Sequence, residues 1–150
     1  GNVQKVLVGR ELAADPIVLM TAYAVRGLDI NTSYTIYHLL NEQKKRGVAV
    51  IYVGEDLDVL LELCDRILVL CGGRMLETGI SSEVLTAPYH PYTKALLDAL
   101  VENGMRETPA LRTGTGICPF YRRCPSARER CRTEMPPRKN NSREWWCCAE

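Results

Sequence analysis

Four features are missing from this 150-residue sequence, and each absence narrows the functions that the chain can have. No apolar run approaches the roughly 20 residues that a membrane-spanning helix needs. Lys5 and Arg10 interrupt the N-terminal region, so it does not resemble a signal peptide. The pattern G-x-x-x-x-G-K-[ST] is absent, which removes the usual phosphate-binding loop and its lysine. No two cysteines are separated by two to four residues, as a pair is in most zinc sites.

The charge of the chain is small in total but unevenly distributed. Charged residues make up 25% and hydrophobic residues 46% of the sequence, and the net charge is +1. From Gly104 onward, ten lysines and arginines stand against five acidic residues, whereas the first 103 residues hold nine against thirteen. The arginines of the basic part alternate with cysteines and prolines, which favours a solvated surface over a nucleic-acid-binding one. We therefore expect no nucleic-acid partner.

Short apolar segments alternate with helical patterns through the first half of the chain. Residues 17–20, 48–53 and 67–70 have the continuous apolar character of strands that are buried on both faces. Helical patterns cover residues 2–13 and 33–46, and a further helix follows Asp56. This alternation predicts parallel strands joined by helical crossovers, with one sheet edge left exposed. Gly72 and Gly73 predict a tight turn into a returning strand over residues 75–78.

The stretch PIVLMTAYAVRGLD, residues 16–29, resembles the Walker B strand and D-loop of ABC-type ATPases. Three flanking segments extend the resemblance over residues 1–79. GNVQK at the N-terminus resembles the second half of the ABC signature, VAVIYVGEDL the next strand and switch loop, and CDRILVLCGGR the following strand and turn. The resemblance implies an α/β fold, namely a partial P-loop ATPase sheet with flanking helices. We expect three parts, namely the C-terminal portion of the ATPase domain at 1–79, a helical extension at 80–103 and a small cysteine-rich extension at 104–150.

The family's catalytic positions hold other residues in this sequence. Where the family has an aspartate for the magnesium shell and a glutamate for the attacking water, this chain has Ala22 and Tyr23. The switch-loop histidine is replaced by Glu55. None of these side chains suits its expected role at a magnesium–phosphate site. The resemblance implies nucleotide contacts for Gly1, Gln4 and Asp29, with ATP and magnesium bound only together with a partner chain.

A second resemblance covers residues 78–148. PYHPYTKALL, residues 88–97, resembles a segment of the oligopeptide and dipeptide branch of ABC importer ATPases. The tail that follows, with the spacing C-x5-C-x6-C-x15-C, resembles the C-terminal tail of that branch, which is associated with a [4Fe–4S] cluster. We interpret His90 as a structural residue at the start of a helix, with Pro91 in its first turn.

Three interpretations of the five tail cysteines remain open. They can bind a metal centre, form disulfides or stay free thiols. A metal centre would use Cys118, Cys124, Cys131 and either Cys147 or Cys148, between which the sequence does not choose. The wide spacing suits a [4Fe–4S] cluster better than the alternative, zinc. The remaining two cysteines lie in apolar patterns and are expected to be buried as small hydrophobic residues; they are Cys64 and Cys71.

These observations predict a fragment or degenerate form of the ATP-binding subunit of an ABC importer. It would couple nucleotide binding to solute transport without hydrolysing ATP alone. The tail resembles the peptide branch, while residues 1–74 resemble the sugar and nucleoside branch. Expected partners are transmembrane permease subunits and a second ATP-binding subunit, on the cytoplasmic face of the cell membrane. Two alternatives are a non-enzymatic metal or iron–sulfur module on an ABC-derived scaffold, and a decayed fragment without a function of its own.

Overall fold

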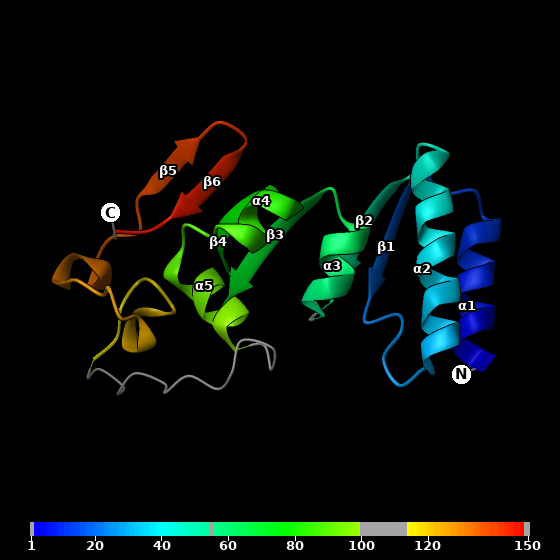
Figure 1. Ribbon diagram of the computed structural model, residues 1–150, viewed down its shortest axis with the longest axis horizontal. Coiled ribbons are helices and arrows are strands. Elements are labelled where there is room, and N and C mark those ends of the chain that lie inside the picture. Colours follow the sequence, from blue (N-terminus) through cyan, green and yellow to red (C-terminus); the bar gives the residue numbers. More distant parts are fainter. Residues whose placement is uncertain (1, 55, 100–113, 149–150) are drawn as a thin grey trace. The chain divides into compact units, whose positions relative to one another are not determined.

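The computed structural model describes residues 2–54, 56–99 and 114–148 of the chain. The chain divides into two compact units, the first ending at Leu63 and the second beginning at Cys64 (Figure 1). The predicted mixture of helices and strands is confirmed in both units. No helix within the described residues is long and apolar enough to cross a bilayer.

The first unit is built on a parallel β-α-β motif. Its elements are α1 (Asn2–Ala13), β1 (Val18–Ala22), α2 (Ile30–Lys45), β2 (Ala49–Val53) and α3 (Leu57–Leu63). β1 and β2 pair in parallel, from Val18 opposite Ala49 to Ala22 opposite Val53. In Figure 1, α1 and α2 lie side by side, and α2 is the crossover between the two strands. The predicted parallel pairing is therefore confirmed for these two strands.

Helix α2 packs through one face. Its buried residues recur at the spacing of a single helical stripe and are Thr32, Ile36, Leu40 and Gln43. The side chain of Asp29 caps the helix start, and Gly47, with a φ of 88°, follows its end.

The strands of the first unit are more exposed than their apolar sequences predict. Val18 and Met20 in β1 are 54% and 70% exposed, and Ile51 and Val53 in β2 are 46% and 43% exposed. Along both strands, exposed residues alternate with half-buried ones. The prediction that these strands are buried on both faces is therefore wrong for the described residues. Within the first unit, the described residues cover one face of the two-stranded sheet more than the other.

The second unit contains an antiparallel sheet. Its elements are β3 (Arg66–Cys71), β4 (Arg74–Ile80), α4 (Ser81–Thr86), α5 (Pro91–Asp98), the 3-10 helices η2 (Tyr121–Arg123) and η3 (Glu129–Arg132), β5 (Pro137–Asn140) and β6 (Arg143–Trp146). The strand order is β3-β4-β6-β5, and every neighbouring pair is antiparallel. The expected third parallel strand, residues 67–70, is thus part of β3 and pairs with β4. Our prediction of its direction was wrong.

A tight turn explains this antiparallel pairing. Gly72 and Gly73 have φ angles of 53° and 73°, which glycine adopts without a steric penalty. The turn returns the chain at once beside β3, so the predicted hairpin is confirmed. The apolar core of the unit forms between the sheet and the helices that follow it, around Ile67, Val69 and Val84.

The C-terminal hairpin joins this sheet. β5 and β6 pair across a turn at Asn141, and β6 also pairs with β4, with Glu77 opposite Trp145 and Thr78 opposite Glu144. The sequence did not predict these strands, because they are short and rich in charged residues. Their pairing brings the cysteines that follow β6 back to the body of the second unit.

Candidate functional site

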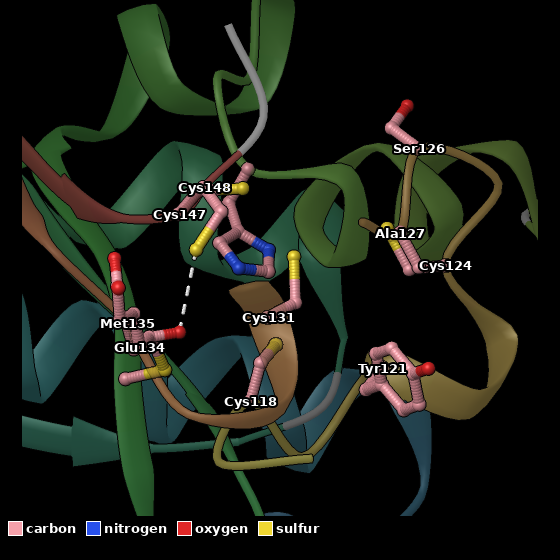
Figure 2. A pocket seen from close by; sticks show the side chains of 11 residues that line it. Cys118, Tyr121, Cys124, Ser126, Ala127, Cys131, Glu134, Met135, Cys147 and Cys148 are labelled. Carbon is pink, nitrogen blue, oxygen red and sulfur yellow. Dashed lines mark hydrogen bonds between the residues drawn. The ribbon is translucent and has the colours of Figure 1, made fainter. Parts of the chain in front are cut away.

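The five tail cysteines line one cavity in the second unit (Figure 2). The cavity volume is about 10 Å³, enough for about one water molecule. Its lining is formed by His90, Cys118, Tyr121, Cys124, Ser126, Ala127, Cys131, Glu134, Met135, Cys147 and Cys148. The structure thus places the five predicted ligand residues around one cavity, and their role as metal ligands stays a prediction. In the part of the chain that the structure describes, Cys64 and Cys71 are half-buried and do not line it.

Two 3-10 helices position the first three cysteines. The Cys118 carbonyl accepts from the Tyr121 amide at 3.0 Å, and Cys124 ends η2 by donating its amide to the Tyr121 carbonyl at 3.3 Å. In η3 the Cys131 amide donates to the Arg128 carbonyl at 3.0 Å, while the Cys131 sulfur accepts from the Arg128 amide at 3.4 Å. These short turns hold three sulfur-bearing side chains within 14 residues of sequence.

The last two cysteines differ in their contacts. The Cys147 amide donates to the Pro136 carbonyl at 3.2 Å, which fixes its backbone beside β5. The Cys148 sulfur donates to the Glu134 carbonyl at 3.3 Å, shown as the dashed line in Figure 2. Cys148 also packs in a buried cluster with Tyr121 and Cys131. Its thiol already has a protein partner, so it is engaged in packing as well as in lining the cavity.

Burial disfavours the thiolate form of several of these cysteines in the absence of a metal. It raises the pKa of Cys124 to about 11, and the neighbouring thiols, Cys147 foremost, add to that effect. Burial also raises the pKa of Cys118, and the neighbouring Cys147 thiol adds to that rise. The pKa of Cys148 also rises to about 11, through burial and through its hydrogen bond with Cys131. A bound cation would have to displace these protons.

The side chains in this cavity do not converge on a single point. Among the described residues, no three histidine, cysteine, aspartate or glutamate side chains are placed so that they could hold one metal ion. Two thiolates on one zinc ion would lie within about 4 Å of each other, because each Zn–S bond measures about 2.3 Å. The arrangement therefore gives no support to the zinc alternative. A [4Fe–4S] cluster places each thiolate on a different iron, and this expectation stays a prediction.

His90 is a lining residue whose position the sequence did not predict. The expectation that it begins a helix is confirmed, because its Nδ1 atom accepts from the Tyr92 amide at 3.0 Å at the start of α5. The side chain is 1% exposed, and its Nε2 atom has no hydrogen-bond partner among the described residues. Burial lowers the pKa of His90 to about 4, against the opposing effects of the Glu77 carboxylate and the Trp146 backbone. The imidazole is therefore neutral at neutral pH.

A buried ion pair connects the tail to the segment that precedes α5. Glu77, on β4, is fully buried and accepts from the Tyr89 amide at 2.9 Å and the His90 amide at 3.0 Å. Arg143, on β6, donates to Glu77 at 2.6 Å and to the Ala87 carbonyl at 2.7 Å. Neither residue stood out in the sequence, because each becomes distinctive only after the strands pair.

The residues expected near nucleotide lie in the first unit. Ala22 ends β1, and Tyr23 follows it with a φ of 52°, its amide donating to the Val53 carbonyl at 2.9 Å. Asp29 accepts from the Thr32 amide at 3.0 Å, so its carboxylate caps α2. The structure leaves the predicted nucleotide contacts untested. Gly1, Glu55 and the side chain of Gln4 lie outside the described residues.

Residues 76–131 match the family described as the oligopeptide/dipeptide transporter, C-terminal region. Similar proteins extend the match over most of the chain. A Brucella abortus protein named for peptide import and ATP binding is 34% identical over an alignment of 147 residues, and the match covers 91% of this chain and 44% of that protein. An Escherichia coli protein named for D,D-dipeptide transport and ATP binding is 34% identical over an alignment of 142 residues, and the match covers 87% of this chain and 46% of that protein.

A third relative carries a similar name. The dipeptide transport ATP-binding protein DppD of Caldanaerobacter subterraneus is 32% identical over an alignment of 146 residues, and the match covers 91% of this chain and 45% of that protein. The chain spans less than half the length of the relatives that it matches.

Proposed function

We propose that this chain, which is similar to the ATP-binding proteins of ABC peptide transporters, serves a peptide importer as an ATP-binding component that does not hydrolyse ATP alone. The observation that carries the proposal is the end of β1, where Ala22 and Tyr23 stand. A methyl group and a phenol cannot replace a carboxylate in holding magnesium-bound water or accepting its proton.

The nearby carboxylates of the first unit have structural roles. Asp29 caps α2, and Asp56 accepts from the Val59 amide at 3.3 Å in the first turn of α3. Tyr23 also turns its backbone away from β1 with a positive φ. These contacts support a unit that holds its strands and helices in place and, within the described residues, offers no general base at the end of β1.

The exposed apolar strands of the first unit support a role within a larger assembly. Val18 and Met20 project from β1 with more than half of their surface exposed. A strand of this composition is normally covered on both faces in a parallel sheet. We propose that further ATP-binding polypeptide covers this face. Transmembrane permease subunits would then receive the conformational change that accompanies nucleotide binding. The chain would then act at the cytoplasmic surface of the membrane.

An assay of phosphate release tests the catalytic part of this proposal. The purified chain, incubated with magnesium and ATP, is expected to release no phosphate above the rate of a sample without protein. Asp29→Ala serves as the control, because it alters a residue of the proposed nucleotide site without touching the cysteine cavity. Phosphate release by the parent chain that disappears in Asp29→Ala would contradict the proposal.

The cysteine cavity favours a second candidate function, the binding of a [4Fe–4S] cluster. The chemistry of the donor set suits that group, since five cysteine sulfur atoms and no charged side chain other than Glu134 line the cavity, although the volume of about 10 Å³ would have to widen to admit a cluster. The buried Nε2 atom of His90 also lacks a partner among the described residues. Cys118, Cys124 and Cys131 would be ligands. Cys147 would be the fourth, because it lies close enough to Cys118 and Cys124 to raise the pKa of both thiols. A bound cluster would supply one-electron chemistry or a structural cross-link.

Iron analysis after anaerobic purification and reconstitution tests this second function. We expect about four irons and four sulfides per chain in the parent protein, and a large loss of both in Cys147→Ser. Cys71→Ser is the matched control, because Cys71 belongs to the same unit but does not line the cavity. Equal iron in the parent, Cys147→Ser and Cys71→Ser would contradict the assignment. Zinc in place of iron would contradict the cluster.

A further inference from the structure

The His90 imidazole joins two parts of the second unit. One ring nitrogen, Nδ1, accepts a hydrogen bond from the Tyr92 amide at 3.0 Å and so caps α5. The other, Nε2, belongs to a residue that lines the cysteine cavity. A single side chain therefore connects the start of a helix with the group of tail thiols.

The helix cap fixes the position of the imidazole proton. An atom that accepts a hydrogen bond carries no proton, so Nδ1 is the bare nitrogen of the ring. The neutral ring must then carry its proton on Nε2, which makes Nε2 a donor. His90 directly precedes Pro91, the first residue of α5. A side-chain acceptor at this position can bind one of the backbone amides that have no partner at the start of a helix.

The Nε2 donor is buried and lacks a well-formed hydrogen bond within the described residues. The side chain is 1% exposed, and Nε2 has no partner at hydrogen-bond geometry, although the Trp146 backbone lies close enough to raise the pKa of the ring. A buried donor left unpaired is costly, so native structures rarely leave one in that state. The other polar groups of the cavity are mostly sulfur atoms, which accept hydrogen bonds well once they are thiolates or bound sulfide.

We propose that the Nε2–H group of His90 donates a hydrogen bond to a sulfur atom, either a cysteine thiolate or an inorganic sulfide, of an iron–sulfur cluster bound in the cysteine cavity. This inference rests on the second function proposed above. His90 is a positioning residue, because it acts on the cluster through a sulfur atom and does not bind iron. A hydrogen bond to sulfur favours the more negative, reduced state of a cluster and so raises its reduction potential.

Two substitutions at His90 separate the donor from the helix cap. His90→Asn keeps a side-chain oxygen close to the position of Nδ1, so it can still accept from the Tyr92 amide, but it removes the donor at Nε2. His90→Gln places an amide nitrogen near the position of Nε2 and so keeps a donor. Asparagine is among the best helix-capping residues, so α5 is expected to remain folded in His90→Asn.

The experiment compares the reduction potentials of the reconstituted 150-residue chain and both variants, titrated anaerobically and followed by absorption and electron paramagnetic resonance. Iron content and circular dichroism are recorded for each sample. We expect equal iron in all three, and about a tenfold smaller ratio of reduced to oxidised cluster in His90→Asn at a fixed potential. That change corresponds to about 59 mV for one electron. His90→Gln is expected to restore most of the parent potential.

The possible failures of the two proposals are distinguishable. Full iron content with equal potentials and equal resonance spectra in the parent and His90→Asn would overturn the inference and leave the cluster standing. The Nε2 donor would then be directed at the backbone of Trp146, which also raises the pKa of the ring. Absence of iron from the reconstituted parent chain would overturn the proposed cluster and this inference together.

Discussion

The guanidinium of Arg143 lies 2.6 Å from the carboxylate of Glu77, and both side chains are almost completely buried. Arg143 also stacks on the ring of Tyr89, with 3.9 Å between the guanidinium carbon and the ring centroid. Glu77 holds the backbone before α5 through the amides of Tyr89 and His90. One buried pair thus connects β4, β6 and the start of α5, and the His90 side chain extends this connection to the cysteines.

Removing one charge of this pair is expected to destabilise the second unit strongly. In Glu77→Gln the Arg143 charge would stay buried without its counter-charge, which costs about 3–5 kcal/mol of the free energy of unfolding. Urea unfolding followed by tryptophan fluorescence measures the effect, because Trp145 lies on β6 next to the pair. Lys139→Ala is the control, since its ion pair with Glu144 at 3.2 Å is exposed and contributes less than about 1 kcal/mol. Similar losses in both variants would contradict the prediction.

A larger residue at Gly79 is expected to weaken the packing of β4 against β6. A Cβ atom at Gly79 would lie 2.8 Å from Cγ of Arg143 and 3.0 Å from Cγ2 of Val84. Gly79→Ala should therefore cost about 1–3 kcal/mol through overpacking. Gly9→Ala is the opposite case, because a Cβ in the middle of α1 meets no atom within 4 Å. It should stabilise its helix by about 1 kcal/mol. Urea midpoints that shift in the same direction for both variants would refute this distinction.

The stability of the metal-free chain is expected to depend on His90 in mild acid. The folded pKa of about 4 lies below the ordinary value of 6.5, so the folded chain binds fewer protons than the unfolded chain between these values. The contribution of His90 to stability is therefore full above pH 6.5 and is lost as the pH falls towards 4.

Urea midpoints measured from pH 7 to pH 4 test this dependence. The slope should be shallower for His90→Asn than for the parent chain, because asparagine does not titrate. His38→Asn, which alters an exposed residue of α2, should follow the parent curve. Parallel curves for the parent and His90→Asn would show that His90 is not buried in the neutral form.

Asp29 is expected to stabilise the first unit through its helix cap. Its carboxylate accepts from the Thr32 amide at 3.0 Å and from the Thr32 hydroxyl at 2.6 Å. Asp29→Ala should lower the free energy of unfolding by about 1 kcal/mol, and Asp29→Asn should keep most of it, since asparagine caps nearly as well. Thermal unfolding followed by circular dichroism measures both. Equal losses would mean that the negative charge, and not the cap, stabilises this helix.

Local signals were sufficient to predict most single elements of this fold. The helical pattern over residues 33–46, the helix that follows Asp56 and the Gly72–Gly73 turn each depend on a few neighbouring residues, and each is confirmed. The direction of residues 67–70 was predicted wrongly, because an apolar strand is compatible with either a parallel or an antiparallel neighbour. The burial of β1 and β2 was also predicted wrongly, since it depends on what covers their second face.

The sequence by itself determined the chemistry that this chain can offer. It placed Ala22 and Tyr23 where the family has carboxylates, and it supplied five tail cysteines at a spacing that excludes the usual zinc pair. Only the tertiary structure decided which of these groups meet. The pairing of β4 with β6 joins Glu77 to Arg143 across 66 residues of sequence and brings His90 to the cysteine cavity. Such contacts depend on strand pairing and burial, and no local pattern of residues records them.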